Sequence, residues 1–237
     1  MKVTEVVKRL ESMADSKALE GLAKFGSRPK NALGGITVPT LHSLAREVGR
    51  SHELAQELWA TGLHEARLLA CLIDDPRLVS EAQMERWVRD FDAWDICDTC
   101  CGYLFDKTAL NYRKAIEWSE RGEEYVKRAA FALMAYLAVH DKKAPDEKFL
   151  QFLPLIKREA VDGRNFVKKA VNWALRSIGK RNIILNEAAV AAAREIHESN
   201  SGSARWVASD ALRELTGEAV QRKLHAKAAK NDTSHNS

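Results

Sequence analysis

Two aromatic residues each lie one helical turn from a charged residue. Trp94 precedes Asp98 by four residues, and Trp173 follows Lys169 by four residues. Residues four apart share one face of a helix, so each pair would place an indole beside a charge. A carboxylate kept ionised by neighbouring cations can stabilise a positive charge that develops during a reaction, or can orient a water molecule. Asp98 is therefore the candidate catalytic residue.

Each of these residues also has a purely structural interpretation. Trp94 and Trp173 could pack in the core between paired helices. We expect this for three other tryptophans, Trp59, Trp87 and Trp118. Asp98 could form salt bridges with Arg67 and Arg128 on neighbouring helices. From the residues alone, both interpretations stay open.

The helices that must carry these residues recur along the chain. Four glycines each precede an alanine-rich segment with apolar residues at helical spacing: Gly62, Gly122, Gly163 and Gly202. Aligning the segments places a cation at one shared position, and the position expected near residue 98 holds a carboxylate. The column consists of Arg67, Asp98, Arg128, Lys169 and Arg205. In stacked helices such a column forms a row, here basic with one acidic member.

The composition favours a helical protein. Of the 237 residues, 46% are hydrophobic and 30% are charged, and β-branched alternation is nearly absent. Repeats of about 30 to 45 residues with two helices each are typical of HEAT- and armadillo-like proteins. We predict an all-α fold, a right-handed α-α superhelix whose second helices line a concave basic face.

The predicted solenoid occupies residues 1–217 as a single domain, and we expect a disordered basic tail over 218–237. The tail contains three lysines, Lys223, Lys227 and Lys230. No apolar run approaches the roughly 20 residues that span a bilayer, and the N-terminus lacks the pattern of a secretory signal. We expect a cytoplasmic monomer that has no contact with membranes.

The cysteines suggest structural thiols. Cys97, Cys100 and Cys101 occupy positions i, i+3 and i+4 of one expected helix, without a second cluster of ligands nearby. Buried reduced thiols fit this spacing better than a zinc site, in which ligands usually converge from two segments. The histidines are scattered. We therefore expect no metal ion and no cofactor.

The positive charge gathers around the column. The chain has a net charge of +4, and Lys127, Lys168 and Arg176 lie close in sequence to members of the column. Cations interleaved with indoles suit a polyanion that carries flat bases, so we favour a nucleic acid as the partner. A solvated charged face is the alternative interpretation.

Three segments resemble the AlkD-type DNA alkylation repair glycosylases of bacteria, which consist of HEAT-like repeats. They are residues 91–98 (Phe-Asp-Ala-Trp-Asp-Ile-Cys-Asp), 126–130 (Val-Lys-Arg-Ala-Ala) and 166–176 (Phe-Val-Lys-Lys-Ala-Val-Asn-Trp-Ala-Leu-Arg). The first resembles the Trp-Asp-x-x-Asp segment of that family. The resemblance covers residues 5–215, whereas residues 26–40 match poorly.

The resemblance implies roles for four residues. Asp98 corresponds to the catalytic carboxylate, Trp94 and Trp173 to aromatic residues that bracket the damaged nucleotide, and Arg128 to a cation of the same cleft. It further implies double-stranded DNA with alkylated bases as the partner. Cations around the four, Lys127, Lys168, Lys169, Arg176, Arg205 and Arg67, would contact the DNA backbone.

The implied activity is hydrolysis of the N-glycosyl bond of cationic N3- or N7-alkylated purines, such as 3-methyladenine and 7-methylguanine, without base flipping. The reaction belongs to base excision repair. The alternative is a non-catalytic HEAT-like protein that binds DNA structures or acts as a scaffold, because related proteins without glycosylase activity exist.

Overall fold

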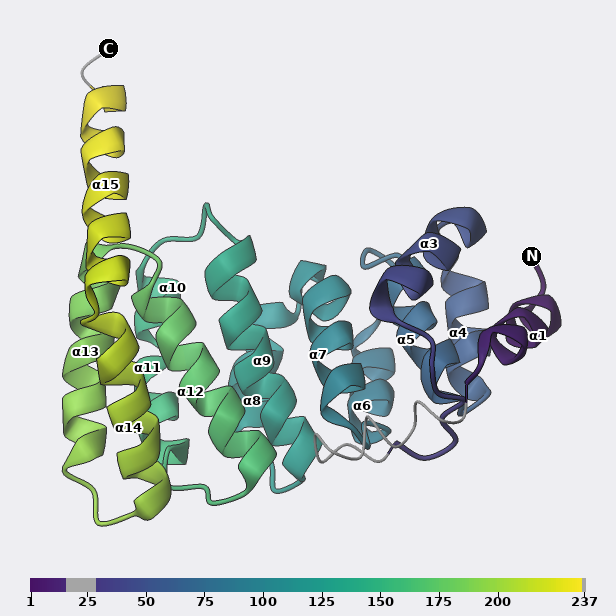
Figure 1. The fold of residues 1–237 in the computed structure, drawn as a ribbon, viewed down its shortest axis with the longest axis horizontal. Helices are drawn as coiled ribbons and strands as arrows, with labels where there is room; N and C mark the ends of the chain where they lie inside the picture. Colours follow the sequence, from purple (N-terminus) through teal and green to yellow (C-terminus); the bar gives the residue numbers. More distant parts are fainter. Residues whose placement is uncertain (16–28, 236–237) are drawn as a thin grey trace. The chain divides into compact units, whose positions relative to one another are not determined.

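The protein is described by a computed structural model that covers residues 1–15 and 29–235, with side chains to residue 229. Within these ranges the regular structure is entirely helical (Figure 1). None of the helices found there is both long and apolar enough to cross a bilayer. The described residues divide into two compact units, Met1–Asn111 and Tyr112–Ser237. The sequence predicts a single domain over residues 1–217.

Unit 1 consists of short helices joined by tight turns. They are α1 (Val3–Met13), α3 (Val38–Val48), α4 (His52–Ala60), α5 (His64–Ile73), α6 (Glu81–Arg89), α7 (Trp94–Tyr103) and the 3₁₀ turn η2 (Phe105–Lys107). Helix α5 packs against α3, α4 and α7. Its apolar face, which includes Leu69 and Ala70, is therefore fully buried at the centre of the unit.

Unit 2 carries both long and short helices. They are α8 (Asn111–Ser119), α9 (Glu124–His140), α10 (Glu147–Leu150), α11 (Leu153–Glu159), α12 (Asn165–Gly179), α13 (Ile183–His197), α14 (Gly202–Leu215) and α15 (Glu218–His235). Helix α12 packs against both α9 and α14, while α11 packs against α13 (Figure 1). Helices α9, α12 and α14 thus form one layer and α11 and α13 belong to the other, the two-layer arrangement that is typical of helical repeats.

Local sequence signals set the helix boundaries. Ser51, Ser80 and Ser201 accept hydrogen bonds from backbone amides in the first turns of α4, α6 and α14, which satisfies donors that a helix start leaves unpaired. Gly62 has a positive φ of 72° just ahead of α5, a conformation that favours glycine. The glycine-to-helix pattern found in the sequence is confirmed.

The C-terminal segment differs from its sequence-based expectation. Residues Glu218–His235 form helix α15, which runs beyond the other helices of unit 2, instead of a disordered tail (Figure 1). Residues in the first ten positions of α15 attach it to the rest of unit 2. Leu224 is only 4% exposed, Gln221 donates to the carbonyl oxygen of Leu215 at 2.6 Å, and Lys227 donates to that of Arg181 at 2.8 Å. One buried leucine among polar residues gave too weak a periodic signal to predict this helix.

Candidate nucleic-acid interface

Helix α7 exposes the predicted catalytic pair because its other face is buried. Cys97, Cys100 and Cys101 are fully buried, and the helix packs against α5. Trp94, the first residue of the helix, and Asp98, one turn later, are both half-buried. A carboxylate and an indole are thus presented side by side at the surface of unit 1, as the four-residue spacing predicts.

The thiols beneath this pair are inert. All four cysteines lie in the described part of the chain, where they are buried and form no disulfide. Burial raises the pKa of Cys100 and Cys101 well above the ordinary range, and the charge of Asp98 contributes to the increase at Cys101. A neutral thiol is a small apolar group, so these residues fill space behind α7. The prediction of buried thiols is confirmed.

A histidine fixes the first turn of α7. The Nε2 atom of His64, at the start of α5, lies 2.8 Å from the Oδ2 atom of Asp95, and the His64 side chain is almost fully buried. Burial by itself lowers the pKa of His64. The hydrogen bond to Asp95 and the charges of Asp95, Glu65 and Asp92 outweigh burial, so the pKa is raised above its ordinary value of 6.5.

This raised pKa makes the stability of unit 1 depend on pH. The contribution of the His64–Asp95 pair is complete below the unfolded pKa of about 6.5 and is lost as pH rises through the higher folded value. Urea unfolding between about pH 6 and pH 8.5 should show a stability loss in the wild type that His64→Gln lacks. If the free energy of unfolding depends on pH in the same way in both proteins, the His64–Asp95 pair does not contribute to stability.

Helix α5 also holds the loop ahead of α3. Glu65 is 3% exposed, and its two carboxylate oxygens accept the amides of Gly34 at 2.7 Å and Leu33 at 2.9 Å. The backbone amide of Lys30 donates to Asp92, just before α7, at 2.8 Å. The loop is therefore tied to the residues that precede α7. The poorly matching segment 26–40 lies partly outside the described residues, since 26–28 are not described.

Arg67 has structural partners instead of an open surface. Its guanidinium carbon lies 5.2 Å from the centre of the Trp59 ring, and its Nε atom donates to the Trp59 carbonyl oxygen at 3.3 Å. Its Nη2 atom lies 3.7 Å from a carboxylate oxygen of Asp90. Trp59 itself stacks on Trp87 with ring centres 3.9 Å apart. These contacts favour a role for Arg67 in joining α4, α5 and the end of α6.

The predicted core tryptophans are confirmed. Their exposed fractions are 3% or less: Trp59, Trp87 and Trp118.

In unit 2, Arg128 lies beneath the surface. It is 6% exposed, and it donates to the carbonyl oxygen of Phe166, in the first turn of α12, at 2.7 Å. Its guanidinium carbon also lies 6.0 Å from the centre of the Phe166 ring. The guanidinium group is fixed between α9 and α12. Because it is almost fully buried, it can attract an anion electrostatically, but it cannot move out to form a direct contact.

Two further predicted cations form ion pairs. Lys127 pairs with Glu159, and both side chains are 12% exposed. Arg176 pairs with Glu214 and lies 3.6 Å from an oxygen of Asp210. Each pair joins two helices, and the carboxylates partly neutralise the positive charges that the sequence predicted would contact DNA.

The remaining predicted cations are accessible. Lys169 and Arg205 are exposed. Lys168 is half-buried, with its ammonium 4.9 Å from the centre of the Trp206 ring. Trp206 is 42% exposed and was not predicted as a site residue. Trp206 directly follows Arg205, a member of the aligned column, and this position in the sequence could have indicated it as a site residue.

Trp173 is half-buried on α12 and packs edge to face against Tyr136 of α9, with ring centres 4.9 Å apart. Its indole is therefore fixed in orientation without being fully covered. Of the four residues singled out by the resemblance, Trp94 and Asp98 come together in unit 1, whereas Arg128 and Trp173 belong to unit 2.

Comparison with known proteins adds independent information. A family model described as DNA alkylation repair enzyme matches residues 6–215. No curated protein matches the chain. A solved structure described as "a new family of proteins related to the HEAT-like repeat DNA glycosylases with affinity for branched DNA structures" superposes with a TM-score of 0.74 at 21% identity, covering 90% of this chain and 95% of that one.

A designed armadillo repeat protein in complex with a peptide also matches, with a TM-score of 0.35 at 14% identity, covering 92% of this chain and 96% of that one. The first structural similarity, together with the all-helical fold, confirms the predicted HEAT-like architecture.

Proposed function

Because the chain belongs to the DNA alkylation repair enzyme family, we propose that it is a DNA glycosylase. Its substrates are cationic N3- or N7-alkylated purines, such as 3-methyladenine and 7-methylguanine, in duplex DNA. One observation carries the proposal: the half-buried Asp98 and Trp94 lie one turn apart on α7, whose opposite face is fully buried.

The proposed reaction needs only a carboxylate and water. When the C1′–N bond breaks, its electron pair moves to the purine nitrogen and neutralises the positive charge of the alkylated base. The deoxyribose then acquires oxocarbenium character, which Asp98 stabilises by its negative charge. Water adds to C1′ and releases a proton, which Asp98 accepts. No strong general acid is required because the leaving base is already cationic.

The aromatic residues are assigned to the alkylated nucleotide. An indole attracts a cationic base by about 0.5 to 2 kcal/mol, and Trp94 and Trp173 are both accessible enough to make such a contact. Arg128 is assigned an electrostatic role, since its guanidinium is held by the Phe166 carbonyl group. The excision is proposed to occur without base flipping, by one protein molecule.

The test is the release of free base from duplex DNA methylated at purine nitrogens, by the wild type and by Asp98→Asn. Release by the wild type alone supports the glycosylase.

A second candidate is a non-catalytic protein that binds branched DNA, the property stated for the solved relative. In that case the accessible cations would serve binding alone, and Asp98→Asn would have no functional effect. A preference for four-way junctions over duplexes, with no base released, would favour this candidate.

The accessible cations predict a specific salt dependence. Lys169→Gln should weaken DNA binding uniformly across sequences and reduce the slope of log K against log[salt] by about 1, because one phosphate contact is lost. Arg194→Gln, which removes an exposed cation from α13, is the matched control and should leave the slope unchanged. Equal slopes for both variants would remove Lys169 from the DNA interface.

A further inference from the structure

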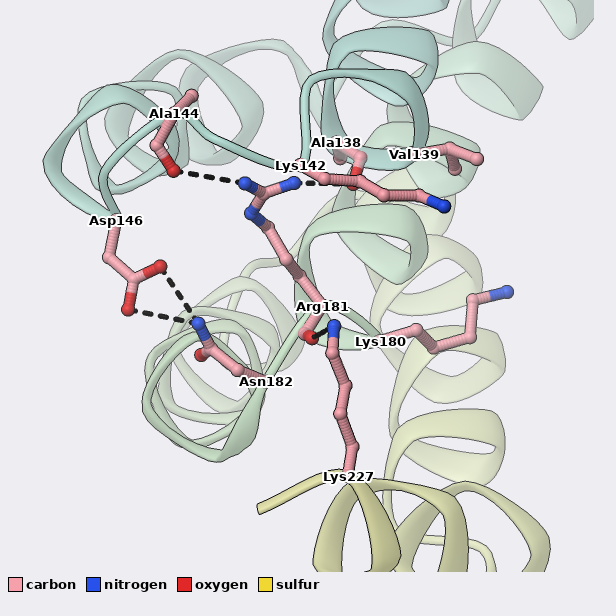
Figure 2. A pocket seen from close by; sticks show the side chains of 9 residues that line it. All are labelled: Ala138, Val139, Lys142, Ala144, Asp146, Lys180, Arg181, Asn182 and Lys227. Carbon is pink, nitrogen blue, oxygen red and sulfur yellow. Dashed lines mark hydrogen bonds between the residues drawn. The ribbon is translucent and has the colours of Figure 1, made fainter. Parts of the chain in front are cut away.

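A cavity of about 520 Å³ lies within unit 2, and none of its lining residues is among those assigned above. It is formed by the C-terminal end of α9 with the loop after it, by the junction of α12 and α13, and by α15 (Figure 2). Its charged lining consists of Lys142, Lys180, Arg181, Lys227 and Asp146. Its size is within the range of pockets that hold small ligands.

The cavity lies at the far end of α12 from the accessible cations. Lys168 is in the first turn of α12, whereas Arg181 follows its last turn. Arg181 comes 13 positions after Lys168, which at a rise of 1.5 Å per residue corresponds to about 20 Å. A ligand at the cavity therefore makes contacts separate from those of Lys168 and Lys169.

The lining is strongly positive. Four cations face one carboxylate, and that carboxylate is engaged, because Asn182 donates to both oxygens of Asp146 at 2.8 and 3.0 Å. Lys180 donates to Glu214 at 2.6 Å, which offsets part of its charge. In the view of Figure 2, the ammonium groups of Lys142 and Lys180 lie on the side of Arg181 opposite to Asp146.

Arg181 gives the cavity a rigid wall. It is 8% exposed, donates to the carbonyl oxygens of Ala138 at 3.0 Å and Ala144 at 2.9 Å, and lies 4.2 Å from the centre of the Phe149 ring. Its backbone carbonyl accepts the ammonium of Lys227, which brings α15 to the cavity. Arg181 and Lys227 are therefore held in place by the fold before any ligand arrives.

Lys142 is the most available donor. It is exposed, and within the part of the chain described it has no side-chain hydrogen bond or ion pair. An ammonium offers three donors, which suits the oxygens of a phosphate group. A second cavity of about 280 Å³ shares Lys180 and Lys227 with the first and adds Lys223 together with Glu214, the carboxylate that pairs with Lys180. Lysines therefore continue along α15.

We propose that this cavity is a second DNA-binding site, which holds a phosphate group of the nucleic-acid backbone between Lys142, Lys180 and Lys227. The choice of DNA as the source of the phosphate rests on the proposed function, but it does not depend on base excision. The ligand chemistry is that of a phosphate oxyanion, which a free phosphate ion would share.

The test compares Lys142→Glu with Lys143→Glu. Lys143 is an exposed neighbour that does not line the cavity, and it makes no side-chain hydrogen bond or ion pair with the residues described. Binding of duplex DNA is measured over a range of salt concentrations for both variants and the wild type. Lys142→Glu should weaken binding about threefold or more and lower the salt slope by about 1, whereas Lys143→Glu should change the slope much less.

Inorganic phosphate is tested separately by thermal shift. Stabilisation of the wild type but not of Lys142→Glu, with unchanged DNA binding, would overturn DNA as the source and assign the cavity to a free anion. Equal salt slopes for both lysine variants, with no shift by phosphate, would overturn the site altogether. Base release by the Lys143→Glu control should equal that of the wild type. The test of the cavity is read from DNA binding and phosphate stabilisation, so its failure is distinguishable from failure of the proposed glycosylase activity, which is read from base release.

Discussion

Asp98→Asn should reduce the release of alkylated purines by about 10²- to 10⁴-fold, the range expected for losing a positioned carboxylate or base. Asparagine keeps the size of the side chain but carries no charge, so it cannot stabilise the oxocarbenium-like sugar or accept the proton of water. DNA affinity should be retained, because a carboxylate near phosphates does not contribute attraction.

Asp95→Asn provides the control on the same helix. Asp95 is bonded to His64, so its substitution should lower the stability of unit 1 and the pKa of His64. Base release per folded molecule should change far less than in Asp98→Asn. Free 3-methyladenine and 7-methylguanine, quantified by mass spectrometry, give the readout.

The outcomes of this comparison are distinct. Residual base release by Asp98→Asn equal to that of the wild type would remove Asp98 from the chemistry. If the wild type binds methylated duplex but releases no base, the non-catalytic DNA-binding protein becomes the leading function. Loss of activity in both aspartate variants to the same extent would indicate that the integrity of α7, and not one carboxylate, is what matters.

The sequence predicted which helix faces carry chemistry, but not which charges stay accessible. The four-residue spacing of Trp94 and Asp98 and the burial of the cysteines follow from helical periodicity within one element. The pairing of Lys127 with Glu159 and of Arg176 with Glu214 joins residues more than 30 positions apart. Periodicity carries no information about such partners, because they depend on how the helices pack.

The same reason explains what was missed in the non-repetitive parts. Gln221 and Lys227 of α15 donate hydrogen bonds to backbone carbonyl groups. Every residue has such a carbonyl group, so these acceptors cannot be recognised from residue types. Trp206 was not among the predicted site residues. Whether its indole on α14 is buried or, as found, 42% exposed depends on how that helix packs, which the spacing of residues does not show.

Glu65→Ala should destabilise unit 1 by about 2 to 4 kcal/mol, because the amides of Leu33 and Gly34 lose charged acceptors in a buried setting. The charge of Glu65 also contributes to the raised pKa of His64, so that pKa should fall in the variant. Urea unfolding measures the first effect and NMR titration of His64 the second. Hydrogen exchange at the amides of Leu33 and Gly34 should accelerate.

Glu47→Ala is the matched control, since Glu47 forms an exposed ion pair with Arg9 and its loss should cost about 0.5 kcal/mol or less. Glu65→Gln should lie between the two, because its amide keeps one acceptor oxygen but no charge. If Glu65→Ala unfolds like Glu47→Ala, the loop ahead of α3 is not held by Glu65. A large stability loss without a change in the pKa of His64 would instead separate the loop anchor from the electrostatic environment of the His64–Asp95 pair.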